Sequence, residues 1–238
     1  MKTLRNFTMP VILLVIVLLS CNVVGEQGNG NVIRQERKVA SFNAIDVSGA
    51  FDIYLSQGTE QSVFVEADEN LMPLIKTVVQ GNTLKIGNEK PIRDPKSLKV
   101  YITVPDLKTI ELSGAVNLHS QNKLTFTELG IEISGATDAN LEIAVQKLDI
   151  SSSGGSEMRF SGMANKVNLD VSGAVDIHAF DLLTEVISLN ISGAGEAEIN
   201  VTKELYAEIS GAASVRYKGD PQKVDSNVSG AGSIKKAN

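Results

Sequence analysis

The 238-residue sequence has no Trp, only 5% aromatic residues, two His and a single Cys. Its longest apolar run, residues 11–19, is too short to span a bilayer as a mature helix. A basic run is also missing. Residues 21–238, which exclude Lys2 and Arg5, contain 20 basic and 28 acidic side chains, a formal charge of about −8. Nucleic acid is therefore a poor candidate partner.

The amino terminus has the pattern of an export signal. Lys2 and Arg5 precede the nine-residue apolar run, and Ser20 and Cys21 follow it. The sequence Leu18-Leu19-Ser20-Cys21 resembles the lipobox of bacterial lipoproteins, in which the signal is cut before a Cys that carries the lipid. We therefore expect a signal peptide over residues 1–20 and a membrane anchor on Cys21; an idle Cys behind an ordinary signal is the alternative.

Residues 21–38 are rich in Gly, Asn, Gln and charge and lack apolar periodicity, which predicts a flexible tether. The expected location is the cell envelope, with the protein anchored at the outer membrane. Whether the folded part faces the periplasm or the outside is left open by the sequence.

What the sequence has in abundance is a repeated tripeptide. Ser-Gly-Ala, or once Ser-Gly-Gly, begins at positions 48, 113, 134, 153, 172, 192, 210 and 229. From position 113 onward the starts lie 18 to 21 residues apart. A fixed period near 20 residues is typical of a stacked repeat, whose units bury their apolar faces against one another.

Apolar and polar residues alternate on both sides of each tripeptide, which is strand periodicity. The sequence predicts an all-β fold, a parallel β-helix (solenoid) with coils of about 18 to 21 residues over 113–238. The Gly of each tripeptide is expected at a corner that needs a positive φ or a close approach of the next coil. These corner glycines are Gly49, Gly114, Gly135, Gly154, Gly173, Gly193, Gly211 and Gly230.

Residues 39–112 are expected to form an irregular β-rich amino-terminal part. Strand-like runs occur at 62–66, 76–79, 83–86 and 98–104, and Gly81-Asn82 predicts a hairpin between two of them. A short helical turn is expected within 68–74. The 65 residues between the first two tripeptides leave two alternatives open, three degenerate coils or a cap over the first coil.

Few residues suggest chemistry. Four acidic residues that each follow a repeat Ser by four positions would line up about 4.8 Å apart on successive coils, a candidate calcium ladder: Asp138, Glu157, Asp176 and Glu196. Plain solvent exposure of these carboxylates is the favoured alternative. His119 and His178 occupy equivalent positions about three coils apart, on the order of 14 Å, too far for one metal. No catalytic residue and no cofactor is predicted.

Several segments in order resemble one bacterial family, called putative auto-transporter adhesin, head GIN domain. They are residues 44–55, 63–71 and 98–107 and the trailing Ser-Gly-Ala units, within a match over roughly 39–235. The resemblance implies an exported, often lipid-anchored β-helical domain and brings no catalytic residues.

We therefore expect a noncatalytic adhesin or binding scaffold with a glycan or protein ligand. A carbohydrate-active β-helix enzyme and a purely structural or sensory envelope protein are the alternatives. The almost constant repeat spacing leaves little room for the insertions that build a catalytic cleft. The last coil offers an unpaired edge, so a homo-oligomer is also considered.

Overall fold

The computed structural model describes residues 25–237, which form β-strands and a single short 3₁₀ turn, η1 (Met72–Leu74). The strands are β1 (Glu26–Gln27), β2 (Val32–Glu36), β3 (Ala44–Gln57), β4 (Ser62–Asp68), β5 (Ile75–Gln80), β6 (Thr83–Asn88), β7 (Ile92–Arg93), β8 (Leu98–Val104), β9 (Thr109–Ser120), β10 (Leu124–Ser152), β11 (Gly155–Val171), β12 (Ala174–Lys218), β13 (Lys223–Gly230) and β14 (Ser233–Lys236). The predicted all-β class is confirmed. In the described part no helix is long and apolar enough to cross a bilayer.

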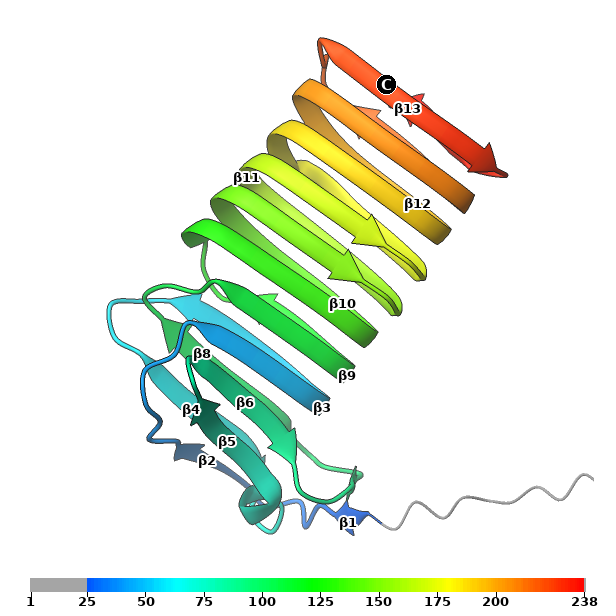
Figure 1. The fold of residues 1–238 in the computed structure, drawn as a ribbon. Coiled ribbons are helices and arrows are strands. Elements are labelled where there is room, and N and C mark those ends of the chain that lie inside the picture. The colour runs from blue at the N-terminus through cyan, green and yellow to red at the C-terminus, as the bar shows by residue number, and fades with distance from the viewer. Residues whose placement is uncertain (1–24, 238) are drawn as a thin grey trace, which may run out of the picture.

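The large sheet is mostly parallel and follows the order β13-β12-β11-β10-β9-β3-β8-β4-β2 (Figure 1). From β3 to β13 each stretch pairs in parallel with the equivalent stretch of the next repeat. Ser48 faces Ser113, and Ser113 faces Ser134. Strands β10 and β12 are longer than one repeat, so they bend at the tripeptides and run on (Figure 1).

The parallel register places like residues over one another, and this builds the core. Because alternate side chains of a strand point to opposite faces, every second residue of each repeat joins an inward ladder. The position three before each Ser is a buried aliphatic residue in seven successive repeats: Ile45, Ile110, Ile131, Ile150, Leu169, Leu189 and Ala207. One continuous hydrophobic cluster results.

The amino-terminal part combines both alternatives left open by the sequence. Strands β6 and β8 pair in parallel with the two halves of β3, so together they act as one interrupted repeat. Beyond them the sheet turns antiparallel, because β5 pairs with β6, β4 with β8, and β2 with β4. The β5–β6 hairpin turns at Gly81, whose φ is 63°.

The predicted flexible tether over residues 21–38 is wrong for residues 26–27 and 32–36. Residues 26–27 pair with β7, and residues 32–36 pair with β4. The strand partners of these residues lie far away in the sequence, so the local composition could not indicate the pairing. Residues 1–24, which include the predicted signal peptide, Cys21 and the start of the tether, lie outside the described residues.

Candidate functional site

Two long outer faces of the repeat region carry rows of charged side chains. We call the first the mixed-charge face; its residues follow the repeat Ser by four or six positions: Asp138, Glu157, Arg159, Asp176, His178, Glu196, Glu198 and Arg216. The second, the acidic face, lies two and four positions before the Ser: Glu111, Glu132, Asp149, Asp170 and Glu208. Strand alternation turns each set outward on β9 to β12.

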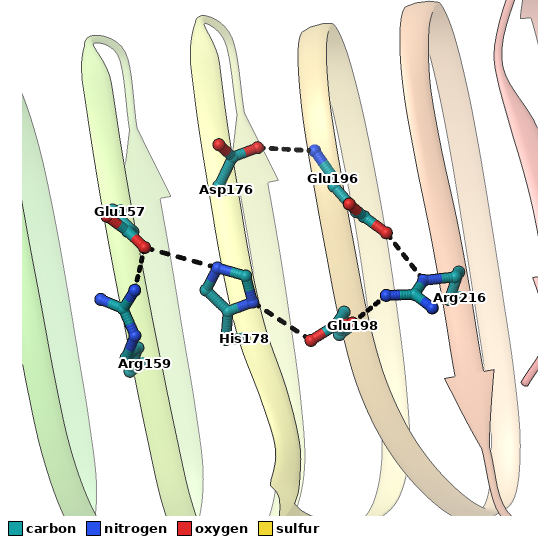
Figure 2. A network of polar contacts seen from close by, with 7 residues as sticks. All are labelled: Glu157, Arg159, Asp176, His178, Glu196, Glu198 and Arg216. Atoms are coloured by element: carbon teal, nitrogen blue, oxygen red, sulfur yellow. Dashed lines mark hydrogen bonds and ion pairs between the residues drawn. The ribbon is translucent and has the colours of Figure 1, made fainter.

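On the mixed-charge face, Arg and His side chains alternate with carboxylates along one line of contacts (Figure 2). His178 lies between two carboxylates, with Nδ1 3.1 Å from Glu198 Oε2 and Nε2 3.5 Å from Glu157 Oε1. Arg159 pairs with Glu157 on its own strand and lies 3.8 Å from Asp138 on the previous repeat.

At the other side of the network, Arg216 bridges two carboxylates. Its Nε donates to Glu196 Oε1 at 2.7 Å, and its terminal nitrogen donates to Glu198. The Glu196 backbone N–H in turn donates to Asp176 Oδ1 at 3.0 Å. Glu198 therefore has both His178 and Arg216 as partners (Figure 2).

This arrangement bears on the four residues of the predicted calcium ladder. Asp138, Glu157 and Glu196 each have an arginine partner, and Asp176 accepts a backbone hydrogen bond. Arginine side chains of the chain itself thus pair with three of the four carboxylates of the candidate calcium ladder, for which plain solvent exposure was the favoured interpretation. Within residues 25–237, no group of three or more His, Cys, Asp or Glu is placed to hold a metal ion.

The network also contains residues that the sequence analysis missed. The sequence indicates only a solvent-facing strand position for His178, whereas the structure places it between two carboxylates, and Arg159, Glu198 and Arg216 occupy the same position of nearby repeats. Reading the columns four and six residues after each Ser together would have shown carboxylates next to Arg and His side chains.

The acidic face is different because it has few cations. Asp149 is paired, with Lys147 Nζ at 2.6 Å and Asn168 Nδ2 at 2.6 Å. Burial raises the pKa of Asp149, but these hydrogen bonds outweigh burial and hold that pKa below its ordinary value. Among the described residues, Glu111, Glu132, Asp170 and Glu208 form no ion pair, and all four are exposed.

Two shallow, open grooves follow this face. One, of about 400 Å³, is lined by Glu132, Asp149 and Asp170 together with the polar side chains of Ser151, Asn168, Ser188 and Asn190. The other, of about 220 Å³, runs between Glu111, Glu132 and the serines of three repeats. The acidic face thus offers a strip of carboxylate, amide and hydroxyl groups along several repeats.

The corner glycines form a column in which successive backbones touch. A Cβ on Gly154 would lie 2.0 Å from the Gly135 carbonyl oxygen, and the same clash recurs at 2.0 to 2.6 Å from Gly114 to Gly230. Gly49, the first of the column, would instead meet the Asn88 side chain at 2.6 Å. Positive φ occurs at Gly49, Gly114, Gly211 and Gly230. All the corner glycines therefore lie in close contact with a neighbouring part of the chain, and half of them also have a positive φ.

An aromatic row, which no sequence pattern indicates, crosses the amino-terminal strands. Tyr54 and Tyr101 stack with ring centroids 5.0 Å apart, and the Arg34 guanidinium lies 4.3 Å from the Tyr101 centroid. His119 tilts against Tyr54 at 5.7 Å. Because the ring faces cover one another, the row contributes packing and leaves no open aromatic platform for a sugar.

Comparison with known proteins agrees with this architecture. The chain is 30% identical to a crystal structure of a putative adhesin from Bacteroides fragilis, with a TM-score of 0.85 over 90% of this chain and 100% of that one. A putative lipid binding protein from Parabacteroides distasonis is 23% identical with a TM-score of 0.71, covering 89% of this chain and 99% of that one. A putative adhesin from Parabacteroides merdae is 21% identical with a TM-score of 0.69, covering 89% and 98%. The last two show the fold alone.

None of the curated proteins matches the chain. The profile of one family does, over residues 41–221. This match confirms the resemblance seen in the sequence: the chain belongs to the family described as putative auto-transporter adhesin, head GIN domain.

Proposed function

We propose that this protein is a noncatalytic envelope adhesin or binding scaffold, tethered to the membrane by lipid on Cys21, which binds its ligand along the acidic face. The single observation that carries the proposal is the row of unpaired carboxylates, Glu111, Glu132 and Asp170, beside an open groove. The description of the family and of the Bacteroides fragilis relative as putative adhesins supports a binding role.

The body that presents this face is proposed to be a parallel β-helix. Three features support it: the in-register parallel pairing, the corner column of glycines, and strands that continue past the length of one repeat. Such a body holds equivalent side chains about 4.8 Å apart without any flexible loop. A repeating ligand can then make the same contact several times, each contact adding little by itself.

The groups on the face suggest a hydroxyl-rich ligand. Carboxylate oxygens accept hydrogen bonds from hydroxyls, while the amides of Asn168 and Asn190 can both donate and accept. The grooves are open and shallow, and a glycan lying along the strip would meet these groups in succession. We therefore propose a glycan as the ligand, with a basic protein surface as the competing outcome of the test.

Binding to a glycan array tests this proposal. The variant E111Q/E132Q/D170N removes three charges from the acidic face, and D138N/D176N/E196Q is the matched control on the mixed-charge face. We expect the first variant to lose at least tenfold in glycan affinity and the second to retain it. Equal loss in both variants, or no glycan binding by the wild type, would contradict the proposal. Release of reducing sugar from a bound polysaccharide would favour a carbohydrate-active enzyme instead.

The anchor is tested separately. Cys21→Ser removes the proposed lipid attachment site. We expect the protein to leave the membrane fraction, because the lipid is then absent and the apolar run of residues 11–19 is too short to span a bilayer as a mature helix. Protease treatment of intact cells then decides whether the domain faces the outside. If the C21S protein stays in the membrane fraction to the same extent as the wild type, the lipid anchor is wrong.

A further inference from the structure

The last strand of the large sheet is an open edge. Within the described chain β13 is hydrogen-bonded only to β12, and every residue of β13 is exposed. Val224 and Val228 are 44% and 38% exposed, yet they continue the ladders of Leu205 and Ile209, which are 0% and 2% exposed one repeat earlier. The inward side of β13 therefore has the composition of a core that lacks its next layer.

The opposite end is built differently. There the parallel order ends in the antiparallel strands β4 and β2, and a second antiparallel hairpin, β5–β6, lies beside them (Figure 1). A copy stacked head to tail would have to place its antiparallel end against the parallel ladder of β13. The two ends do not match, so this contact is disfavoured.

We propose that β13 pairs with β13 of a second copy of this chain, giving a two-fold symmetric dimer. A two-fold axis through a strand makes that strand meet itself in antiparallel orientation. Both rows of unpaired backbone groups are then satisfied, and the exposed valines are covered.

The side chains select one register, with the axis at Ser226. Val224 then lies opposite the partner subunit's Val228, and Asp225 lies opposite the partner subunit's Asn227. Moving the axis to Asp225 would place two aspartates opposite each other, which is unfavourable. Moving it to Asn227 would leave Val224 opposite the partner subunit's Gly230. An axis midway between two residues would place inward side chains of one strand opposite outward side chains of the other.

The neighbouring edge strand, β14, is a poor site for such pairing. It carries Lys235 and Lys236, and Lys236 forms an ion pair with Asp220 at the rim of the last repeat. Lysines on an edge oppose pairing with another chain. The charges therefore leave β13 as the face on which a second copy fits.

The mature protein, isolated in detergent from the producing cells, is studied by sedimentation velocity over a range of concentrations. We expect a monomer–dimer equilibrium in the wild type. Asn227→Asp places a carboxylate opposite the partner subunit's Asp225, whereas Asn227→Lys places a cation there. The dimer dissociation constant should differ by about tenfold between these variants at low salt, with N227K the tighter, and the difference should shrink in high salt.

A charge exchange fixes the register. In D225K/N227D the two positions carry opposite charges, so the dimer weakened by N227D should become tighter again. All three variants alter exposed side chains and keep the same amino terminus, so differences between them report on β13. Circular dichroism checks that each variant is folded. A wild type that is monomeric at every concentration, or a dimer indifferent to these substitutions, would overturn the proposal.

Discussion

At the scale of single residues, Gly154 and Gly155 show why the repeat tolerates so little at its corner. A Cβ on Gly154 would lie 2.0 Å from the Gly135 carbonyl oxygen, whereas a Cβ on Gly155 would meet nothing within 4 Å. Neither residue has a positive φ. The two neighbours therefore differ in the space around them and not in backbone strain.

We predict opposite outcomes for the two alanine substitutions. Gly154→Ala forces the stacked backbones apart and should lower the free energy of unfolding by about 2 to 3 kcal/mol. Gly155→Ala restores the residue found in every other repeat and should be neutral or stabilising by about 0.5 kcal/mol, because it restricts the unfolded chain. Urea denaturation of both variants measures this difference. Similar losses in the two would show that contact at the corner is not what requires Gly154.

One departure from the repeat pattern is explained by a second. Ser152 occupies a position that is Val, Leu or Ile in the other repeats, and its side chain is buried. Its hydroxyl lies 2.9 Å from that of Ser156, which is also buried. The two buried hydroxyls thus form a hydrogen bond with each other, so neither is left without a partner in the core. The pairing can be recognised in the sequence only once the inward positions are known.

At the scale of strands, the sequence predicted well where the signal is local, in strand alternation or in turn residues. The run 98–104 coincides with β8, and Gly81-Asn82 lies at the turn of an antiparallel hairpin. By contrast, β1 and β2 pair with strands that lie far away in the sequence, and no pattern in residues 26–36 predicts these two strands. The neighbouring columns of carboxylates and of Arg and His side chains on the mixed-charge face can be read from the repeat alignment, whereas the grooves on the acidic face depend on how successive repeats pack.

A buried carboxylate joins the first strands to the rest of the sheet. Asp68, at the end of β4, accepts hydrogen bonds from the backbone N–H of Gly30 at 2.6 Å, Lys96 at 2.8 Å and Ser97 at 3.3 Å. Burial raises the pKa of Asp68, but the backbone donors together outweigh burial and hold that pKa below its ordinary value. The ionised carboxylate is thus the form that ties the segment before β2 to the segment before β8.

We predict that Asp68→Asn lowers the free energy of unfolding at pH 7 by about 1 to 3 kcal/mol, because a neutral amide replaces an ionised acceptor of three hydrogen bonds. Since the pKa of Asp68 is lowered on folding, its contribution is complete above the unfolded value of about 3.9 and is lost as the pH falls through the folded value. The difference between wild type and D68N should therefore shrink below about pH 4.

Urea denaturation at pH 7, 5 and 3 measures this effect. Asp106→Asn, at an exposed position, is the matched control and should leave stability within about 0.5 kcal/mol of the wild type at each pH. A gap between wild type and D68N that stays constant down to pH 3 would mean that ionisation of Asp68 does not contribute.

At the scale of the whole molecule, the two ends of the stack are unequal. The amino-terminal end is closed by antiparallel strands, while β13 at the other end is exposed along its length. Each repeat contacts mainly its neighbours, so local stability depends on how many neighbours a repeat has. Opening is therefore expected to begin at β13 and β14 and to reach β9 and β10 last.

Hydrogen exchange measured by mass spectrometry tests this gradient. The N227D variant, which the proposed dimer contact disfavours, is used at low concentration so that pairing does not protect β13. Peptides from β13 and β14 should exchange at least a hundredfold faster than peptides from β9 and β10, because the inner strands are hydrogen-bonded on both sides. In the wild type, raising the concentration should slow exchange in β13 and leave β10 unchanged. Uniform protection from β9 to β13 in the monomer would instead mean that the repeats open as one cooperative unit, and that the exposed edge does not weaken the end of the stack.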